Sequence, residues 1–224
     1  MTLDARVRGH DLNFELTETA GRLELTAHHH PAYRPIWADW TGAGMQSRIA
    51  GGKKQLLARA VGLRKNPGLR VLDGTAGLGR DGFLLAFLGA RVTMAERNSS
   101  VAALLRDAHR RALLDPATAE AAARIEIVEA DGRTLCGPGS PSRFDVVYLD
   151  PMYPDRGKTA LAGRELQILR ELTGGDPDAD DLLASAHARQ RVVVKRPVKA
   201  PPLAGRAPSL ALTGTQARFD IYLA

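Results

Sequence analysis

The chain has 224 residues, of which 44% are hydrophobic and 25% charged, as expected for one α/β domain with a substantial core. No apolar run is long enough to cross a membrane or to form the core of a signal peptide, so we expect a cytoplasmic protein without a membrane partner. The single cysteine, Cys136, excludes an internal disulfide.

The formal net charge is +6, with an isoelectric point near 9.8. Such a charge raises the encounter rate and the affinity of an enzyme for a polyanion, whereas an enzyme that acts on a small neutral metabolite has no need of it. Nucleic acid is therefore the favoured partner, and the alternative is a basic surface without one.

The predicted elements begin with a β-hairpin. Its strands, 12–16 and 22–26, alternate apolar and polar residues on either side of a turn at 17–21. We interpret residues 1–45 as a small N-terminal hairpin and connector, and residues 46–224 as the main domain.

Two features of the connector invite a functional interpretation. Three adjacent histidines, His28, His29 and His30, cannot all reach one ion in an extended segment, and no Cys or acid pair lies nearby. A solvated loop is therefore favoured, with no metal site. Both tryptophans lie within 35–40, where buried anchoring is favoured over stacking on a nucleobase.

The region from Arg70 to Arg97 predicts one β-α-β unit that binds a nucleotide-like cofactor. A short apolar strand ends at Asp73, a glycine-rich turn leads into an apolar helix, and a second strand ends at Glu96. Glycines at such a turn let the backbone approach a ligand closely. An acid at the tip of the next strand accepts hydrogen bonds from ribose hydroxyls.

This unit fits two classes of cofactor. Residues 77–82 satisfy the dinucleotide pattern GxGxxG, in which a helix N-terminus holds a pyrophosphate. Asp73 and Asp81 would repel a pyrophosphate, but they suit a ligand that carries an ammonium and a sulfonium. The spacing resembles the first motif of S-adenosylmethionine (SAM)-dependent methyltransferases, so SAM is favoured over a nicotinamide cofactor.

Further elements follow the pattern of a doubly wound sheet. Helices are predicted over 53–61, 99–114 (capped by Asn98), 116–123 and 178–188, and a basic loop with a helix is predicted over 158–172. Strands are predicted over 125–128, 144–149, 192–195, 210–213 and 219–223. Asp131, which follows the third strand of the main domain, is either a partner for the adenine amino group or a simple turn residue.

A second chemical motif, Asp150-Pro151-Met152-Tyr153, follows the strand 144–149. It resembles the D/N-P-P-Y/F motif of methyltransferases that modify exocyclic amines of nucleobases, with Met152 in place of the second proline. We expect the Asp150 carboxylate and the Pro151 carbonyl to accept N–H bonds of the target amine, and Tyr153 to stack on the base.

Taken together, the motifs resemble those of the RsmJ (YhiQ) family of small-subunit ribosomal RNA guanine-N2 methyltransferases, from about Gly51 to Tyr222. They are GLGRD (77–81), AERN (95–98), YLDPMYP (148–154), VVVKRP (192–197) and RFDIY (218–222). The resemblance implies a Rossmann-like class I fold with a seven-stranded, mostly parallel, doubly wound sheet and one antiparallel strand near the C-terminus.

The resemblance also implies the ligands and the residues that hold them. The cofactor is SAM, and the substrate is a guanine of 16S ribosomal RNA within a 30S particle. The residues expected to hold SAM are Gly77, Arg80, Asp81, Glu96, Arg97, Asp131, Gly132 and Asp150. Lys195, Arg196 and Lys199 are expected to contact RNA phosphates. The alternatives are transfer to another amine, in DNA, transfer RNA or protein, and a non-catalytic RNA-binding protein.

Overall fold

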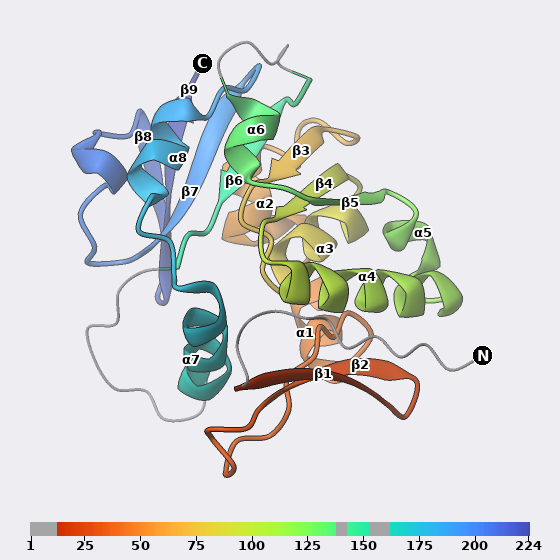
Figure 1. Cartoon of the computed structure of the whole chain (residues 1–224). Coiled ribbons are helices and arrows are strands. Elements are labelled where there is room, and N and C mark those ends of the chain that lie inside the picture. The colour runs from red at the N-terminus through yellow and green to blue at the C-terminus, as the bar shows by residue number, and fades with distance from the viewer. Residues whose placement is uncertain (1–12, 138–142, 153–161) are drawn as a thin grey trace.

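The computed structural model describes residues 13–137, 143–152 and 162–224. Seven strands of the main domain form one sheet in the order β5-β4-β3-β6-β7-β9-β8 (Figure 1). They are β3 (Arg70–Asp73), β4 (Arg91–Glu96), β5 (Ile125–Glu129), β6 (Val146–Leu149), β7 (Arg191–Pro197), β8 (Leu210–Thr213) and β9 (Ala217–Leu223).

Strand direction confirms the predicted topology. Neighbours from β5 to β7 pair in parallel, and β9 pairs antiparallel with both β7 and β8. The strand order reverses between β3 and β6, because the chain adds β4 and β5 on one side of β3 and then returns to add β6 on the other. Open α/β sheets bind their ligands at this switch point, beyond the carboxyl ends of the strands.

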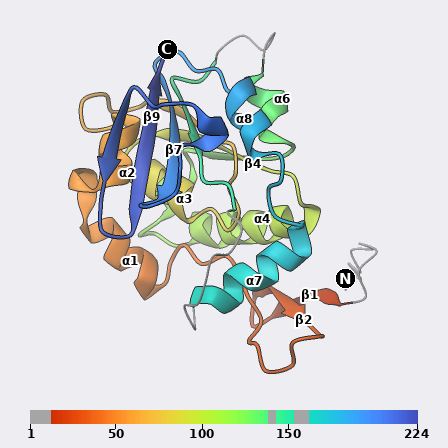
Figure 2. The ribbon, with the colours of Figure 1, turned by 90° about the vertical axis from the view of Figure 1, so that its left-hand side faces the viewer.

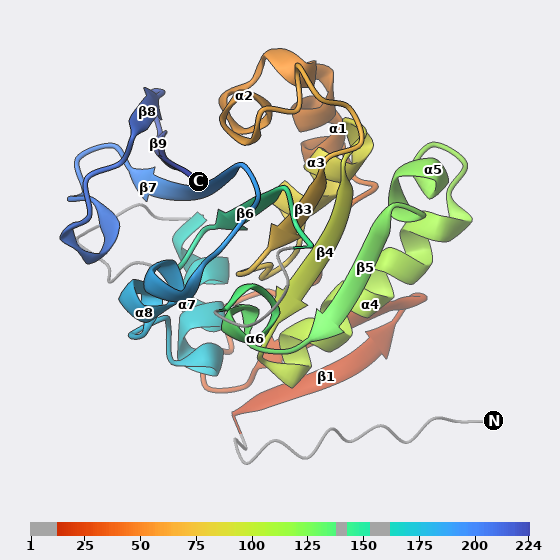
Figure 3. The same ribbon diagram turned by 90° about the horizontal axis from the view of Figure 1, so that it is seen from above.

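Both faces of the sheet are buried, which explains why the central strands are short continuous apolar runs. Successive residues of a strand point to opposite faces, so the neighbours Val71 and Leu72 belong to two different hydrophobic clusters. One face is covered by α1 (Ala43–Ala50), α2 (Leu56–Val61), α3 (Arg80–Phe87) and α4 (Ser99–Leu114), and the other by α6 (Gly132–Cys136) and α8 (Ala179–Ser185) (Figure 3). Also described are α5 (Ala119–Ala122), α7 (Ala162–Thr173) and two 3-10 helices (Gly52–Lys54 and Leu203–Gly205).

The N-terminal hairpin, β1 (Phe14–Thr19) and β2 (Arg22–Ala27), packs against α4. The amide of Leu23 donates to Asp107 at 3.1 Å, and Arg110 donates to the carbonyl of Gly21 at 3.0 Å. Figure 2 shows α7 beside this hairpin. The hairpin residue Leu25 also joins the core cluster of the main domain, so the hairpin is fastened to that domain along one helix.

The connector after the hairpin is held by Trp40, and the predicted buried anchoring is confirmed for this residue. Trp40 has no exposed surface, its Nε1 donates to the carbonyl of Leu78 at 2.9 Å, and its ring stacks on Phe83 with centroids 5.1 Å apart. Because Leu78 lies in the glycine-rich turn, the connector supports the turn from behind. Within the described residues, no helix is both long and apolar enough to cross a bilayer.

Candidate active site

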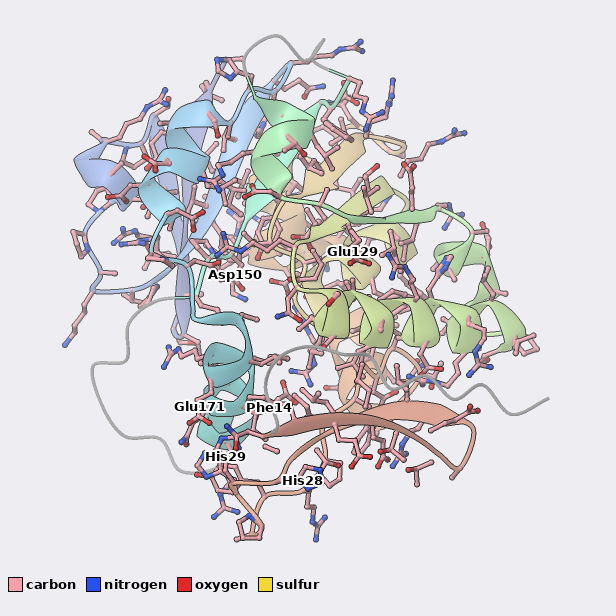
Figure 4. All side chains as sticks on the ribbon, viewed as in Figure 1. Phe14, His28, His29, Glu129, Asp150 and Glu171 are labelled. Atoms are coloured by element: carbon pink, nitrogen blue, oxygen red, sulfur yellow. The ribbon has the colours of Figure 1, made fainter. Side chains whose placement is uncertain are left out.

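A cavity of about 700 Å³ lies at the carboxyl ends of the five parallel strands. Its wall is completed by Arg48 of α1, by residues of α7 and by Asp176 and Asp178 of the loop that follows. It brings together every residue expected to hold the cofactor: Gly77, Arg80, Asp81, Glu96, Arg97, Asp131, Gly132 and Asp150. Asp150 comes directly after β6, at the switch point (Figure 4).

Glu96 is fixed in place by backbone amides. Gly77 donates to its Oε2 at 3.0 Å and Asn98 donates to its Oε1 at 2.8 Å. Gly77 has φ of +53°, a conformation that favours glycine. The Glu96 side chain is buried at the tip of β4, and this burial raises the pKa of the carboxyl. Its position suits an acceptor for ribose hydroxyls.

At two glycines of the site, a side chain would collide with a neighbouring segment. A Cβ on Gly132 would lie 2.5 Å from the carbonyl oxygen of Gly74, so the start of α6 approaches the glycine-rich turn closely. Gly79 has φ of +72°, and a Cβ there would lie 2.6 Å from the indole of Trp40. The glycine-rich turn after β3 and the start of α6 therefore pack closely together, and both line the cavity; we call this pair of segments the glycine cradle.

Lys195 of β7 lies between two carboxylates, those of Asp81 and Asp150, in the wall of the cavity. Its Nζ is 3.0 Å from Asp81 Oδ2 and 2.8 Å from Asp150 Oδ2. Asp81 also pairs with Arg48 and accepts a hydrogen bond of 2.5 Å from the Tyr148 hydroxyl. Burial alone would raise the pKa of Asp81, but Lys195 and Arg48 hold it well below its usual range.

The remaining acids of this group are less easily ionised. Burial raises the pKa of Asp150, and Asp81 adds to the effect, although Lys195 opposes it. Burial, together with the charges of Asp81 and Asp150, raises the pKa of Asp73 to about 8. At neutral pH Asp73 therefore carries a proton. A cationic ligand bound beside Asp73 would stabilise its carboxylate and so favour release of this proton.

Several predicted cofactor residues have protein partners at the rim. Arg80 makes two bonds to Glu165 of α7, at 2.6 and 2.8 Å. Arg97 contacts Asp176 at 2.7 Å and Asp178 at 2.8 Å. Asp131 caps α6 and pairs with the guanidinium of Arg133 at 2.6 Å. Turn chemistry thus accounts for the partners of Asp131, and its contact with adenine stays a prediction.

The residues expected to contact RNA lie in different surroundings. Lys195 faces the cavity, and Arg196 is 5% exposed, with its guanidinium donating to the carbonyl of Pro201. These pairings do not favour phosphate contacts by either side chain, whereas Lys199 is exposed. Pro151 is buried directly after Asp150, and Tyr153 lies outside the described residues.

Three residues of the site were not among the predicted site residues. Thr75 Oγ1 accepts from the amide of Asp150 at 2.6 Å, which fixes the backbone of the second motif to the turn of the first. Tyr148 and Arg48 both contact Asp81. The parallel pairing of β3 with β6 brings Thr75 beside Asp150, a register that the sequence alone does not provide.

The reversed strand order, the glycine cradle and the acid at the tip of β4 define a class I SAM-dependent methyltransferase. A family described as "Putative SAM-dependent methyltransferase" matches residues 4–224. A crystal structure of a SAM-dependent methyltransferase from Neisseria gonorrhoeae is similar, with a TM-score of 0.74 and 36% identity, covering 97% of this chain and 85% of the other.

Curated relatives identify the family more narrowly. Ribosomal RNA small subunit methyltransferase J of Coxiella burnetii is 44% identical over 217 residues, which is 95% of this chain and 84% of the relative. The protein of the same name from Laribacter hongkongensis is 45% identical over 216 residues, 95% of this chain and 76% of the relative. The chain belongs to the ribosomal RNA small subunit methyltransferase J family, and its cofactor is SAM.

Proposed function

We propose that the chain transfers a methyl group from SAM to the exocyclic N2 amine of one guanine in small-subunit ribosomal RNA, within an assembled 30S particle in the cytoplasm. The observation that carries this proposal is the placement of Asp150 and Pro151 at the carboxyl end of β6, where Asp150 lines the cofactor cavity. The name of the curated relatives supports the RNA substrate, and the net charge of +6 supports a polyanionic partner.

Bound SAM supplies an electrophilic methyl group. The guanine amine is a poor nucleophile because its lone pair is delocalised into the purine ring. The Asp150 carboxylate and the Pro151 carbonyl accept its two N–H bonds, turn the lone pair towards the methyl carbon and stabilise the positive charge that develops on nitrogen. The bond from the Asp150 amide to Thr75 holds this acceptor pair in position. The S–CH3 bond breaks as the N–CH3 bond forms, so S-adenosylhomocysteine is the other product. A strong general base is unnecessary, because methylation makes the amine proton acidic and this proton passes to solvent water.

Lys195 supports this role of Asp150. Its ammonium, 2.8 Å from the Asp150 carboxylate, opposes the effect of burial and favours the ionised acceptor. Lys195 is therefore a positioning residue in our proposal. Of the three predicted RNA contacts, we retain the exposed Lys199 as a phosphate contact. We also propose that Tyr153 stacks on the extruded base.

Substitution of Asp150 tests the proposal. We expect Asp150→Asn and Asp150→Ala to lower turnover by about 10²- to 10³-fold. An uncharged amide lacks the negative charge that stabilises the developing positive charge on nitrogen, and alanine has no acceptor at all. The affinity for SAM, measured by calorimetry, should be largely kept and should fall far less than turnover, because the glycine cradle and Glu96 are untouched. Glu120→Ala, which alters an exposed acid on α5, is the control. An Asp150 variant with wild-type turnover would contradict the assignment.

A further inference from the structure

Outside the cofactor cavity, His29, His30 and Glu171 form a compact cluster (Figure 4). The Nε2 of His29 lies 2.7 Å from Glu171 Oε2, and the Nε2 of His30 lies 2.9 Å from the same oxygen. The ligand atoms of all three residues lie within 4.8 Å of one another. The cluster joins the loop after β2 to α7, and His29 and Glu171 are 142 residues apart in the sequence. Our interpretation of the three histidines as a solvated loop missed this distant acid.

We propose that this cluster is a zinc site. Two imidazoles and one carboxylate are ligands that Zn²⁺ takes, and one carboxylate charge suits a divalent cation. Tetrahedral Zn²⁺ with bonds of about 2.0–2.1 Å places its ligand atoms about 3.3 Å apart. The His–Glu distances of 2.7 and 2.9 Å fall short of that value by about half an ångström, a shift that exposed side chains make readily. Water supplies the fourth ligand.

Neighbouring residues hold two of the three ligands, His30 and Glu171, in position. The ring of His30 stacks on Tyr33, with centroids 4.5 Å apart and 14° between the planes. The Tyr33 hydroxyl donates to Gln167 Oε1 at 3.0 Å, and Gln167 Nε2 donates to Glu171 Oε1 at 2.8 Å. One chain of contacts thus leads from an imidazole ligand to the carboxylate ligand. This arrangement leaves Glu171 Oε2 directed at both histidines.

The position of the cluster fits a structural role. The side chains of His29, His30 and Glu171 are 31%, 25% and 34% exposed, so an ion and its water can enter. Two α7 residues near Glu171, Leu169 and Thr173, line the cofactor cavity. A bound ion would therefore fasten the N-terminal hairpin to the helix that forms one wall of the active site.

The test is a titration of the full-length, tag-free protein with Co²⁺, which reports tetrahedral coordination by its visible absorption, followed by displacement with Zn²⁺. We expect one ion per chain. Glu171→Gln and His29→Ala should each weaken binding by at least about tenfold. The matched controls are His28→Ala and Glu15→Gln, because His28 and Glu15 form a neighbouring exposed pair, 2.9 Å apart, outside the cluster. Both controls should bind the ion as the wild type does.

Two outcomes would overturn the proposal. One is an absence of saturable Co²⁺ binding by the wild-type protein, which would leave His29, His30 and Glu171 as an ion-pair cluster. The other is an equal loss of affinity in His28→Ala and His29→Ala. Thermal unfolding gives a second readout: Zn²⁺ should raise the melting temperature of the wild type and not that of Glu171→Gln. Circular dichroism verifies that each variant is folded.

Discussion

Lys195 interacts with two acids, Asp81 and Asp150, whose pKa values shift in opposite directions. Asp81 at the start of α3 is held ionised by Lys195 and Arg48, whereas Asp150 is shifted towards the protonated form by burial. Burial alone would lower the pKa of the Lys195 ammonium, yet the two carboxylates hold it above its usual value. The cation therefore remains charged across the physiological range and limits how far the pKa of Asp150 rises.

Lys195→Met distinguishes a role of the cation beside Asp150 from a role in binding RNA. Removal of the cation should raise the pKa of Asp150 further, so the acidic limb of the kcat/KM profile should move to higher pH. A role in binding RNA phosphate predicts a different result, in which the acidic limb stays in place and the dependence of RNA affinity on salt becomes weaker. A pH–rate profile and a salt titration on the same variant distinguish the two roles.

Asp73 makes folding depend on pH in a direction opposite to that of most carboxyl groups. Its pKa is about 8 in the folded protein and 3.8 in a free side chain. The folded state therefore keeps a proton that the unfolded state has released. This contribution to stability is complete below about pH 4 and is lost as the pH rises through about 8.

Asp73→Asn tests this linkage, because an amide mimics the neutral acid. Between pH 5 and 8 the wild type should lose at most about 4 kcal/mol of unfolding free energy through Asp73, and the variant should lose correspondingly less. Urea unfolding at several pH values measures the difference. Parallel pH dependences for the two proteins would show that Asp73 is ionised in the folded state.

At the scale of elements, the cofactor cradle depends on how closely α6 approaches the turn after β3. No flexible side chain separates them, because the atom that a Cβ on Gly132 would meet is the backbone oxygen of Gly74. A methyl group there must push apart two segments that both line the cavity.

Gly132→Ala should therefore destabilise the protein by about 1–3 kcal/mol and weaken SAM binding by at least about tenfold. Gly163→Ala is the matched control: Gly163 lies in α7, and a Cβ there would meet nothing within 4 Å. Alanine at this position should stabilise its helix by about 0.5–1 kcal/mol and leave SAM affinity unchanged. Thermal unfolding and calorimetry check both variants, and wild-type affinity in Gly132→Ala would contradict this view of the cradle.

The sequence predicts elements well where a local signal exists. The strands are apolar runs bounded by turn residues, and α4 begins where Asn98 accepts from the amides of Ser100 and Val101. The helix expected over 53–61 is instead a 3-10 turn and a separate α2, because Gln55 adopts an extended conformation between them. The helix α1 was not expected, since it lacks a helix start signal: its N-cap, Gly42, makes no side-chain bond, and its first turn contains no acid.

The candidate site was predictable only in part. Residues at strand ends, such as Glu96 and Asp150, follow from the rule that parallel sheets present their carboxyl ends to ligands. The partners of Asp150 do not follow from this rule. Thr75 and Lys195 come close to Asp150 only because β6 pairs with β3 and β7. The pairing of His29 with Glu171 likewise depends on the position of α7 in the fold. No residue close to His29 in the sequence indicates this pairing.

At the scale of the whole molecule, the protein has to bind two ligands of opposite charge. RNA is a large polyanion, whereas SAM is a small cation that occupies the cavity. The net charge of +6 favours binding to RNA, while acids gather inside the cavity that holds SAM. Under our proposal the enzyme recognises a single guanine in a long RNA, and because such recognition depends on shape, we expect the assembled subunit to be preferred over naked RNA as the substrate.

The most direct test is transfer of labelled methyl groups from SAM to small ribosomal subunits that lack their own modification, with naked ribosomal RNA, transfer RNA and DNA alongside. Nucleoside analysis should then find the label in N2-methylguanosine, with the assembled subunit as the preferred substrate. Label in another nucleoside would contradict the guanine-N2 assignment. Absence of label in every substrate, with SAM binding intact, would contradict RNA methylation by this chain.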